Sequence, residues 1–285
     1  MPAWTAVILL ALPFTIFNKM ANKRALSSVG IYVYGAAAIA LGIFGILWGD
    51  FATNWQRVKA DVPHREVLAY ATAFYELVGG IAIFWRRTAR AGALMLSVLY
   101  SVFALLWVLQ ILAAPGVYDG WGNFFEESAL VIAGVGLWAS LAPADSPWQS
   151  RTPWIGRLFG ICVISFALEQ ILFIQATASF VPNWIPPGQM FWAVATTAFF
   201  AMAAPAILSG ILAGLASRLL TAMIVGFELL VWAPRLFSAP QEHFNWSANG
   251  ISLALSGAAW VVSDLIAEPR KAGQELQEAH TVASV

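Results

Sequence analysis

Long hydrophobic stretches, separated by short polar connections, run along almost the whole chain. Eight of them are close to the length of a membrane span, and they cover residues 29–49, 68–85, 91–113, 128–144, 155–177, 189–213, 215–235 and 248–267. A helix rises about 1.5 Å per residue and the hydrocarbon layer is about 30 Å thick, so about 20 apolar residues cross it. The stretches lack the strict alternation of barrel strands, and open strand edges would leave unpaired backbone groups in lipid. The pattern therefore predicts an all-α, polytopic integral membrane protein with eight transmembrane helices.

A ninth apolar stretch, residues 4–17, is shorter and contains Pro13. The basic residues Lys19 and Lys23 follow this stretch, whereas a cleaved secretory signal carries its basic residues before the apolar segment. We therefore expect residues 1–27 to form a retained N-terminal hydrophobic helix and a basic turn. Spanning and half-inserted positions both remain open for this helix.

Lysine and arginine are distributed unevenly over the connections between the stretches. Of the 15 such residues, all but Arg57, Lys59, Arg65 and Arg235 fall on one side of the predicted membrane. The positive-inside rule makes that basic side cytoplasmic. We expect a bacterial cytoplasmic (inner) membrane, with residues 268–285 as a polar cytoplasmic tail.

The hydrophobic pattern is repeated within the chain. A shift of 125 residues superposes Gly35 on Gly160 and Trp107 on Trp232. Because both sets of four stretches begin and end on the basic side, the repeat predicts two parallel four-helix bundles related by an axis along the membrane normal.

The predicted boundaries place the first unit at residues 28–145 and the second at residues 146–267. A connection rich in proline and polar residues joins them, at residues 145–154.

The sequence argues against several classes of enzyme. The single cysteine, Cys162, lies in an apolar stretch, so the chain can form no intramolecular disulfide and no dithiol redox cycle. No Gly-rich phosphate loop, nucleophile elbow or His-Glu-x-x-His motif is present, which disfavours nucleotide-driven pumps and hydrolases.

Three glutamates lie inside predicted spans, where an ionised carboxylate is costly and is a candidate for function. Helix rise places Glu76, Glu169 and Glu228 in one layer of the outer half of the membrane. Their counterparts in the repeat are not acidic, so the two units are expected to share one site, or to form one active and one supporting half. The alternative is that each glutamate is hydrogen-bonded to a neighbour, or protonated by burial, and has no catalytic role. The full set of ligand-binding candidates is Glu76, Glu169, Glu228, Tyr75, Trp107 and Trp232.

A second group of polar residues lies in the outer connections. Its acidic and histidine members are Asp50, Asp61, His64, Glu66, Asp119, Glu126, Glu127, Glu242 and His243. Their spacing matches no metal-binding motif, so no metal is predicted. Glu126 and Glu127 are expected to open the fourth helix, where acids favour the positive end of the helix dipole. The outer-face candidates are His64, Glu127, His243 and Asn245.

Short motifs in the first unit resemble the DoxX-like four-helix membrane proteins. They are Gly35 to Trp48, Val62-Pro63, Tyr75-Glu76-Leu77-Val78-Gly79-Gly80 and the basic turn Arg86 to Arg90. The second unit looks like a diverged copy, in Phe159-Gly160, Val181 to Pro187 and His243 to Trp246. The Glu-Leu-x-Gly-Gly pattern at 76–80 reads Ala-Met-Ala-Ala-Pro at 201–205, so an equivalent role for the second unit does not follow.

The resemblance implies a functionally mixed family. It is named for a small subunit associated with a quinone-linked sulfur oxidoreductase, and similar four-helix proteins act as cargo receptors or assembly chaperones.

Our first hypothesis is therefore a redox-associated accessory, not a stand-alone enzyme, that binds a quinone-like molecule beneath aromatic outer connections. Quinone is the only cofactor that this hypothesis implies. The alternative is that the aromatic residues of the outer connections anchor the protein at the membrane interface.

The second hypothesis is a non-enzymatic membrane carrier, transporter or assembly factor that holds a lipid, a small solute or a partner helix. The expected partners are the lipid bilayer, a lipophilic small molecule, and a membrane protein or a second copy of the chain. No nucleic acid is expected.

Overall fold

The computed structural model describes residues 29–143 and 145–283 of the chain. The predicted N-terminal helix at residues 1–27 lies outside the described residues. All regular elements of the described part are helical. The first half contributes four helices, which are α2 (Val29–Trp48), α3 (Arg65–Ile83), α4 (Ala89–Ala113) and α5 (Tyr118–Ser140).

The second half is more broken than its hydrophobic pattern predicts. Its elements are η2 (Gln149–Arg151), α6 (Thr152–Leu172), α7 (Ile174–Phe180), α8 (Gln189–Ser209), α9 (Ala213–Phe227), η3 (Glu228–Trp232), α10 (Ala233–Ser238) and α11 (His243–Ala283). The predicted stretch at 155–177 is interrupted at Phe173, whose φ of −115° and ψ of 36° leave the helical region. The stretch at 215–235 contains the π-helical turn η3.

Seven helical segments of the described residues are long and apolar enough to cross a membrane. They are Val29–Trp48, Arg65–Ile83, Ala89–Ala113, Gln149–Leu172, Gln189–Ser209, Ala213–Ser238 and His243–Ala267. The prediction of an all-helical integral membrane protein is thereby confirmed. Helix α5 has 23 residues but carries Asp119, Glu126 and Glu127, and it is not among the seven.

Helix α5 also begins earlier than its apolar stretch at 128–144 predicts. It starts at Tyr118, directly after a turn that contains Pro115 and Gly116. Glu126 and Glu127 therefore lie more than two turns inside the helix. The expectation that they open the fourth helix is wrong, because the polar first turns of α5 pack against protein and continue the helix.

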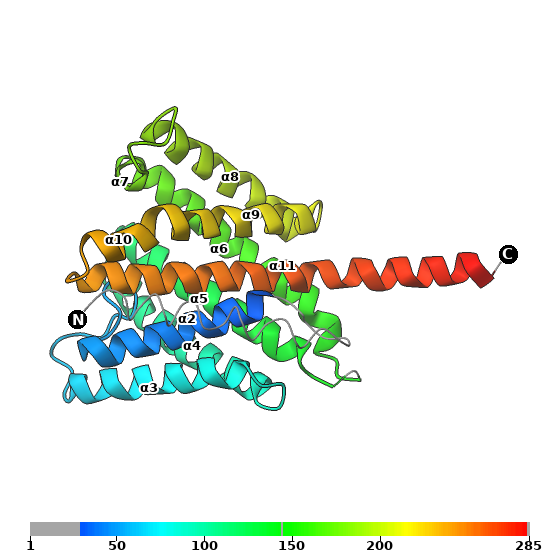
Figure 1. Cartoon of the computed structure of the whole chain (residues 1–285), viewed down its shortest axis with the longest axis horizontal. Helices are drawn as coiled ribbons and strands as arrows, with labels where there is room; N and C mark the ends of the chain where they lie inside the picture. Colours follow the sequence, from blue (N-terminus) through cyan, green and yellow to red (C-terminus); the bar gives the residue numbers. More distant parts are fainter. Residues whose placement is uncertain (1–28, 144, 284–285) are drawn as a thin grey trace.

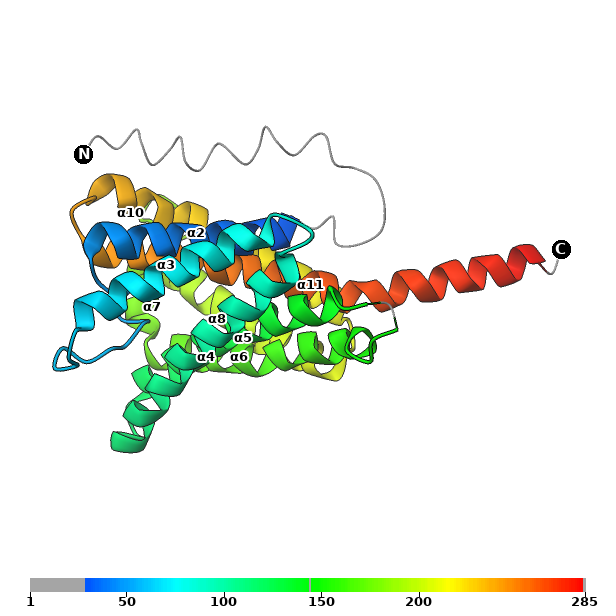
Figure 2. The same cartoon turned by 90° about the horizontal axis from the view of Figure 1, so that it is seen from below.

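Helix α11 lies in the middle of the molecule and packs against α2, α5, α6 and α9 (Figure 1). Its C-terminal part extends beyond the other helices, as the turned view also shows (Figure 2). The last predicted span thus packs directly on the first. One hydrophobic core results, which includes residues from both halves of the chain.

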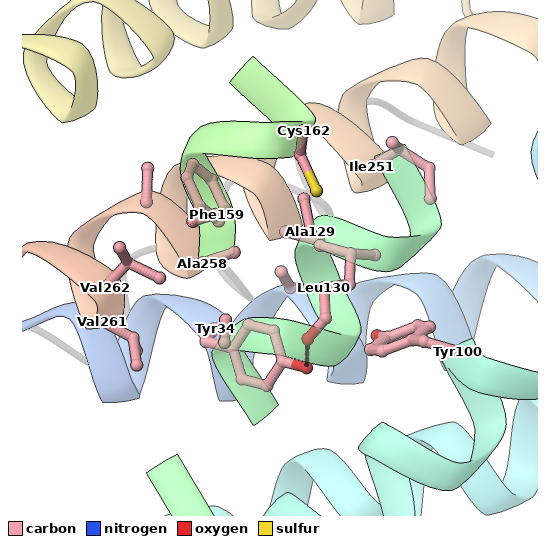
Figure 3. Close-up of a cluster of buried hydrophobic side chains, with 14 of the residues drawn as sticks. Tyr34, Tyr100, Ala129, Leu130, Phe159, Cys162, Ile251, Ala258, Val261 and Val262 are labelled. Carbon is pink, nitrogen blue, oxygen red and sulfur yellow. Dashed lines mark hydrogen bonds between the residues drawn. The ribbon is translucent and has the colours of Figure 1, made fainter. Parts of the chain in front are cut away.

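Close helix approach depends on small residues and on one tyrosine. At Gly257 of α11, an added Cβ would lie 2.5 Å from the backbone nitrogen of Tyr34 on α2. The Tyr34 side chain is buried, and its hydroxyl donates a hydrogen bond of 2.9 Å to the carbonyl of Leu130 on α5 (Figure 3). Gly257 therefore lets α11 approach α2 at the level where Tyr34 ties α2 to α5.

Replacement of Gly257 by alanine is expected to destabilise the fold by about 1–3 kcal/mol, because the added methyl group overlaps backbone atoms that cannot rotate away. Thermal unfolding of the purified protein in detergent measures the effect. Gly226→Ala is the matched control, since a Cβ at Gly226 meets no atom within 4 Å. Equal unfolding temperatures for the two variants would contradict this account of the α2–α11 contact.

Candidate functional site

The connection between α2 and α3, residues 49–64, folds over one end of the bundle, and we call it the cap loop. The backbone nitrogen of Thr53 donates to Ser247 Oγ on α11 at 2.9 Å. Trp107 on α4 donates from its indole nitrogen to the carbonyl of Trp55 at 2.7 Å. The indole of Trp55 in turn donates to the carboxylate of Glu126 on α5. Three helices from both halves of the chain thus hold the cap loop.

Glu76 lies on α3 beneath the cap loop, and its side chain is 2% exposed. One carboxylate oxygen accepts a hydrogen bond of 2.8 Å from the Tyr100 hydroxyl on α4. The other accepts a bond of 3.3 Å from Nε2 of Gln56, a buried residue of the cap loop. The oxygen of the Gln56 amide accepts from the backbone nitrogen of Ala52, so its nitrogen is the end that faces Glu76. Two donors from different elements therefore satisfy this buried carboxyl group.

Glu127 on α5 is 1% exposed, and neither of its carboxylate oxygens has a hydrogen-bond partner. It interacts electrostatically with the carboxyl groups of Glu76 and Glu126, and with the buried hydroxyl groups of Tyr34 and Tyr100. An unsatisfied polar group in a protein interior costs roughly 1–3 kcal/mol, and more when it is charged. The buried carboxyl group of Glu127, without a hydrogen-bond partner, is therefore the strongest indication of a binding function in the described residues.

Glu169 on α6 joins the same region from the second half of the chain. It interacts electrostatically with Glu126 and Asp119 of α5. Its carboxylate lies against Gly122, where an added Cβ would come within 2.9 Å of Oε2. Gly122 therefore leaves room for the carboxylate between α5 and α6. We call Glu76, Glu126, Glu127 and Glu169 the carboxylate cluster.

Glu228 has a different environment, in the π-helical turn η3. Its Oε1 accepts a hydrogen bond of 2.6 Å from Nδ2 of Asn249 on α11, and Ser252 of α11 lies alongside. No hydrogen bond or ion pair among the described residues joins it to the carboxylate cluster. The structure thus brings Glu76 and Glu169 together through α5, and leaves Glu228 to pair with α11.

Two of the three aromatic candidates, Trp107 and Trp232, lie near the cap loop. Trp107 is fully buried and carries the guanidinium of Arg57 over its ring at 5.1 Å. Trp232 belongs to a row of rings that runs from Trp55 through Phe244 to Trp232, with centroid separations of 5.8 and 6.2 Å. Tyr75 packs partly buried against the core.

The remaining outer-face candidates are separate from the cluster. His64 is exposed at the start of α3, in the left-handed conformation with φ of 55°. His243 stacks on Trp48 at 4.6 Å, and buried Asn245 donates to the carbonyl of Ala239 at 3.1 Å. His243 and Asn245 thus make local contacts, and of the four outer-face candidates only Glu127 enters the cluster.

A hollow of about 250 Å³ lies under the cap loop, and we call it the first hollow. Its polar lining includes Asp50, Gln56, Arg57, Arg65 and Asp119. Gln56 also donates to Glu76, so its amide stands between the hollow and the buried carboxyl groups.

The charges of the first hollow are compensated, since Arg65 forms an ion pair of 2.5 Å with Asp50. No group of three or more histidine, cysteine or acidic residues in the described ranges is arranged to hold a metal ion.

Gln56 and Tyr100 are site residues that the sequence did not single out, and Glu126 was expected only to open the fourth helix. Tyr100 is a polar aromatic residue inside an apolar span, which is a usable signal. Gln56 lies in a connection and gives no such signal, because its role depends on how the cap loop folds.

Comparisons with protein families, with curated proteins and with solved structures find no match to this chain.

Removal of the Tyr100 hydroxyl by Tyr100→Phe is expected to destabilise the protein by about 1–3 kcal/mol, because it leaves a buried oxygen of Glu76 without its donor. Tyr70→Phe is the matched control, since Tyr70 lies on the same helix as Glu76 and is 42% exposed. Thermal unfolding in detergent distinguishes the two. A Tyr100 variant as stable as the Tyr70 variant would show that this hydrogen bond contributes nothing to the fold.

Proposed function

We propose that the chain is a DoxX-like protein of the bacterial cytoplasmic membrane, in which α5 spans the bilayer together with the seven apolar segments. The eight spans form two parallel four-helix units, residues 28–145 and 146–267, and the C-terminal tail lies in the cytoplasm. The burial of Glu127 supports the inclusion of α5 among the spans, because its carboxylate packs among protein groups instead of facing lipid.

The proposed activity is the binding of a small lipophilic molecule of the quinone class at the carboxylate cluster, as a redox-associated accessory. The unsatisfied carboxyl group of Glu127 carries this proposal. A hydroquinone hydroxyl would donate to it, and the partly buried ring of Trp55 offers apolar surface to a flat ligand. The chain supplies binding groups and no electron carrier of its own, so electron transfer would belong to a partner protein.

The size of the first hollow restricts which part of such a ligand it could hold. Pockets for drug-sized ligands have volumes of about 300 to 1,000 Å³, and the first hollow has about 250 Å³. A single-ring headgroup beside Gln56 would fit, with its apolar tail in the bilayer. Glu127 does not line the first hollow, so the headgroup would reach it by displacing the Gln56 amide.

Ligand extraction tests the proposal. The wild-type protein, purified in mild detergent, is expected to retain quinone above its share of the total membrane lipid, as measured by mass spectrometry. Glu127→Gln keeps the side-chain shape and replaces one carboxyl oxygen by an amide nitrogen, and is expected to retain roughly two- to tenfold less, because a hydrogen bond contributes about 0.5–1.5 kcal/mol.

Glu66→Gln is the matched control, because Glu66 is an exposed carboxylate at the start of α3. Thermal unfolding of each variant separates lost binding from lost folding. Wild-type protein without enriched quinone, or a Glu127 variant that retains as much as the wild type, would contradict the proposal.

A non-enzymatic carrier or assembly factor is the second candidate function. The observation that favours it is the polar lining of the first hollow, where Arg57, Arg65, Asp50 and Asp119 suit a small polar solute better than an apolar ring. A co-purified protein partner, or a second copy of the chain, without enriched quinone would favour this alternative.

A further inference from the structure

A second hollow, of about 280 Å³, lies between the π-helical turn with α10 on one side and the α7–α8 connection on the other. Its polar lining includes Asn183, Gln189 and Arg235. Its apolar lining includes Leu230 and Val231. The second hollow therefore combines one cation and two amide side chains with an apolar wall.

Arg235 is the charged group of the second hollow. Its guanidinium lies over the ring of Phe180 at 4.7 Å and over the ring of Trp232 at 5.3 Å. Among residues 29–143 and 145–267 it forms no ion pair. Two aromatic faces thus border a cation that has no acidic residue beside it in the hollow, so an anion would supply the missing charge.

The first hollow shows the contrasting arrangement. It contains two arginines, Arg57 and Arg65, but it also contains Asp50 and Asp119, and Arg65 is paired with Asp50 at 2.5 Å. The second hollow has a similar volume and no acidic residue in its lining. Of the two hollows, only the second therefore has an arginine without an acidic residue in its lining.

The surroundings of Arg235 indicate which anion fits. Leu229 and Phe237, on either side along the chain, are 64% and 61% exposed. Both are exposed apolar side chains close in sequence to Leu230 and Arg235, on a segment that is apolar enough to lie in a membrane. A soluble anion would leave this surface unused, whereas a lipid would place its headgroup at the cation and its chains along the apolar residues.

We propose that the second hollow binds the phosphate of an anionic membrane lipid, with Arg235 as its principal ligand. The planar guanidinium donates two parallel hydrogen bonds to phosphate oxygens, a geometry that lysine cannot reproduce. Asn183 and Gln189 border the headgroup, and the acyl chains lie against Leu229, Leu230 and Phe237.

Native mass spectrometry of the full chain in detergent tests this site. Phosphatidylglycerol is the anionic probe, phosphatidylcholine is the zwitterionic comparison, and inorganic phosphate is the soluble competitor. The wild type is expected to retain phosphatidylglycerol in preference to phosphatidylcholine. Arg235→Gln is expected to retain it roughly tenfold less, and Arg235→Lys to fall between them.

Arg57→Gln is the matched control, because Arg57 also lies over a tryptophan ring but belongs to the charge-compensated hollow. Should Arg235→Gln fail to fold, the comparison of wild type with Arg235→Lys gives the same readout. Equal retention of the two lipids by the wild type, or equal losses in the Arg57 and Arg235 variants, would overturn the site. Displacement of phosphatidylglycerol by an equal concentration of inorganic phosphate would overturn the assignment to a lipid.

Discussion

The packing of α11 against α2 is the contact on which the rest of the structure depends. It joins the last span to the first, and Gly257 lets the two backbones approach closely beside Tyr34. Tyr34 then fixes α5 through the carbonyl of Leu130. Since α5 carries Glu126 and Glu127, the position of the carboxylate cluster follows from how tightly α11 and α2 meet. A membrane interior offers little hydrophobic driving force between helices, so such close contacts have to supply the specificity.

The cluster itself illustrates how buried acids are distributed between the halves of the chain. Glu76, Glu126 and Glu127 come from the first half, and α6 of the second half adds Glu169. Glu228, in contrast, pairs with Asn249 within the second half. The halves therefore contribute unequally to one region, and the second half supports it through α6 and through the ring contacts of Phe244.

Much of the helical architecture could be predicted from sequence, and the site only in part. Hydrophobic length located the spans because backbone groups in lipid must pair within a helix. The length of the hydrophobic stretches did not predict the break at Phe173 or the π-helical turn at Glu228, because the residues around both positions remain apolar. It also misplaced Glu127, because a hydropathy pattern treats a carboxylate as the end of a span. The burial of Glu127 depends on α2, α3 and α4, and no local pattern contains that information.

Gln56 gives the cap loop a consequence beyond its shape. One face of its amide is fixed by Ala52 within the loop, and the other is directed at Glu76. Residues of this loop line the first hollow, so any displacement of the loop would change the shape of the hollow and also withdraw a donor from the buried carboxyl group. The position of the cap loop and the environment of Glu76 are therefore linked through one side chain.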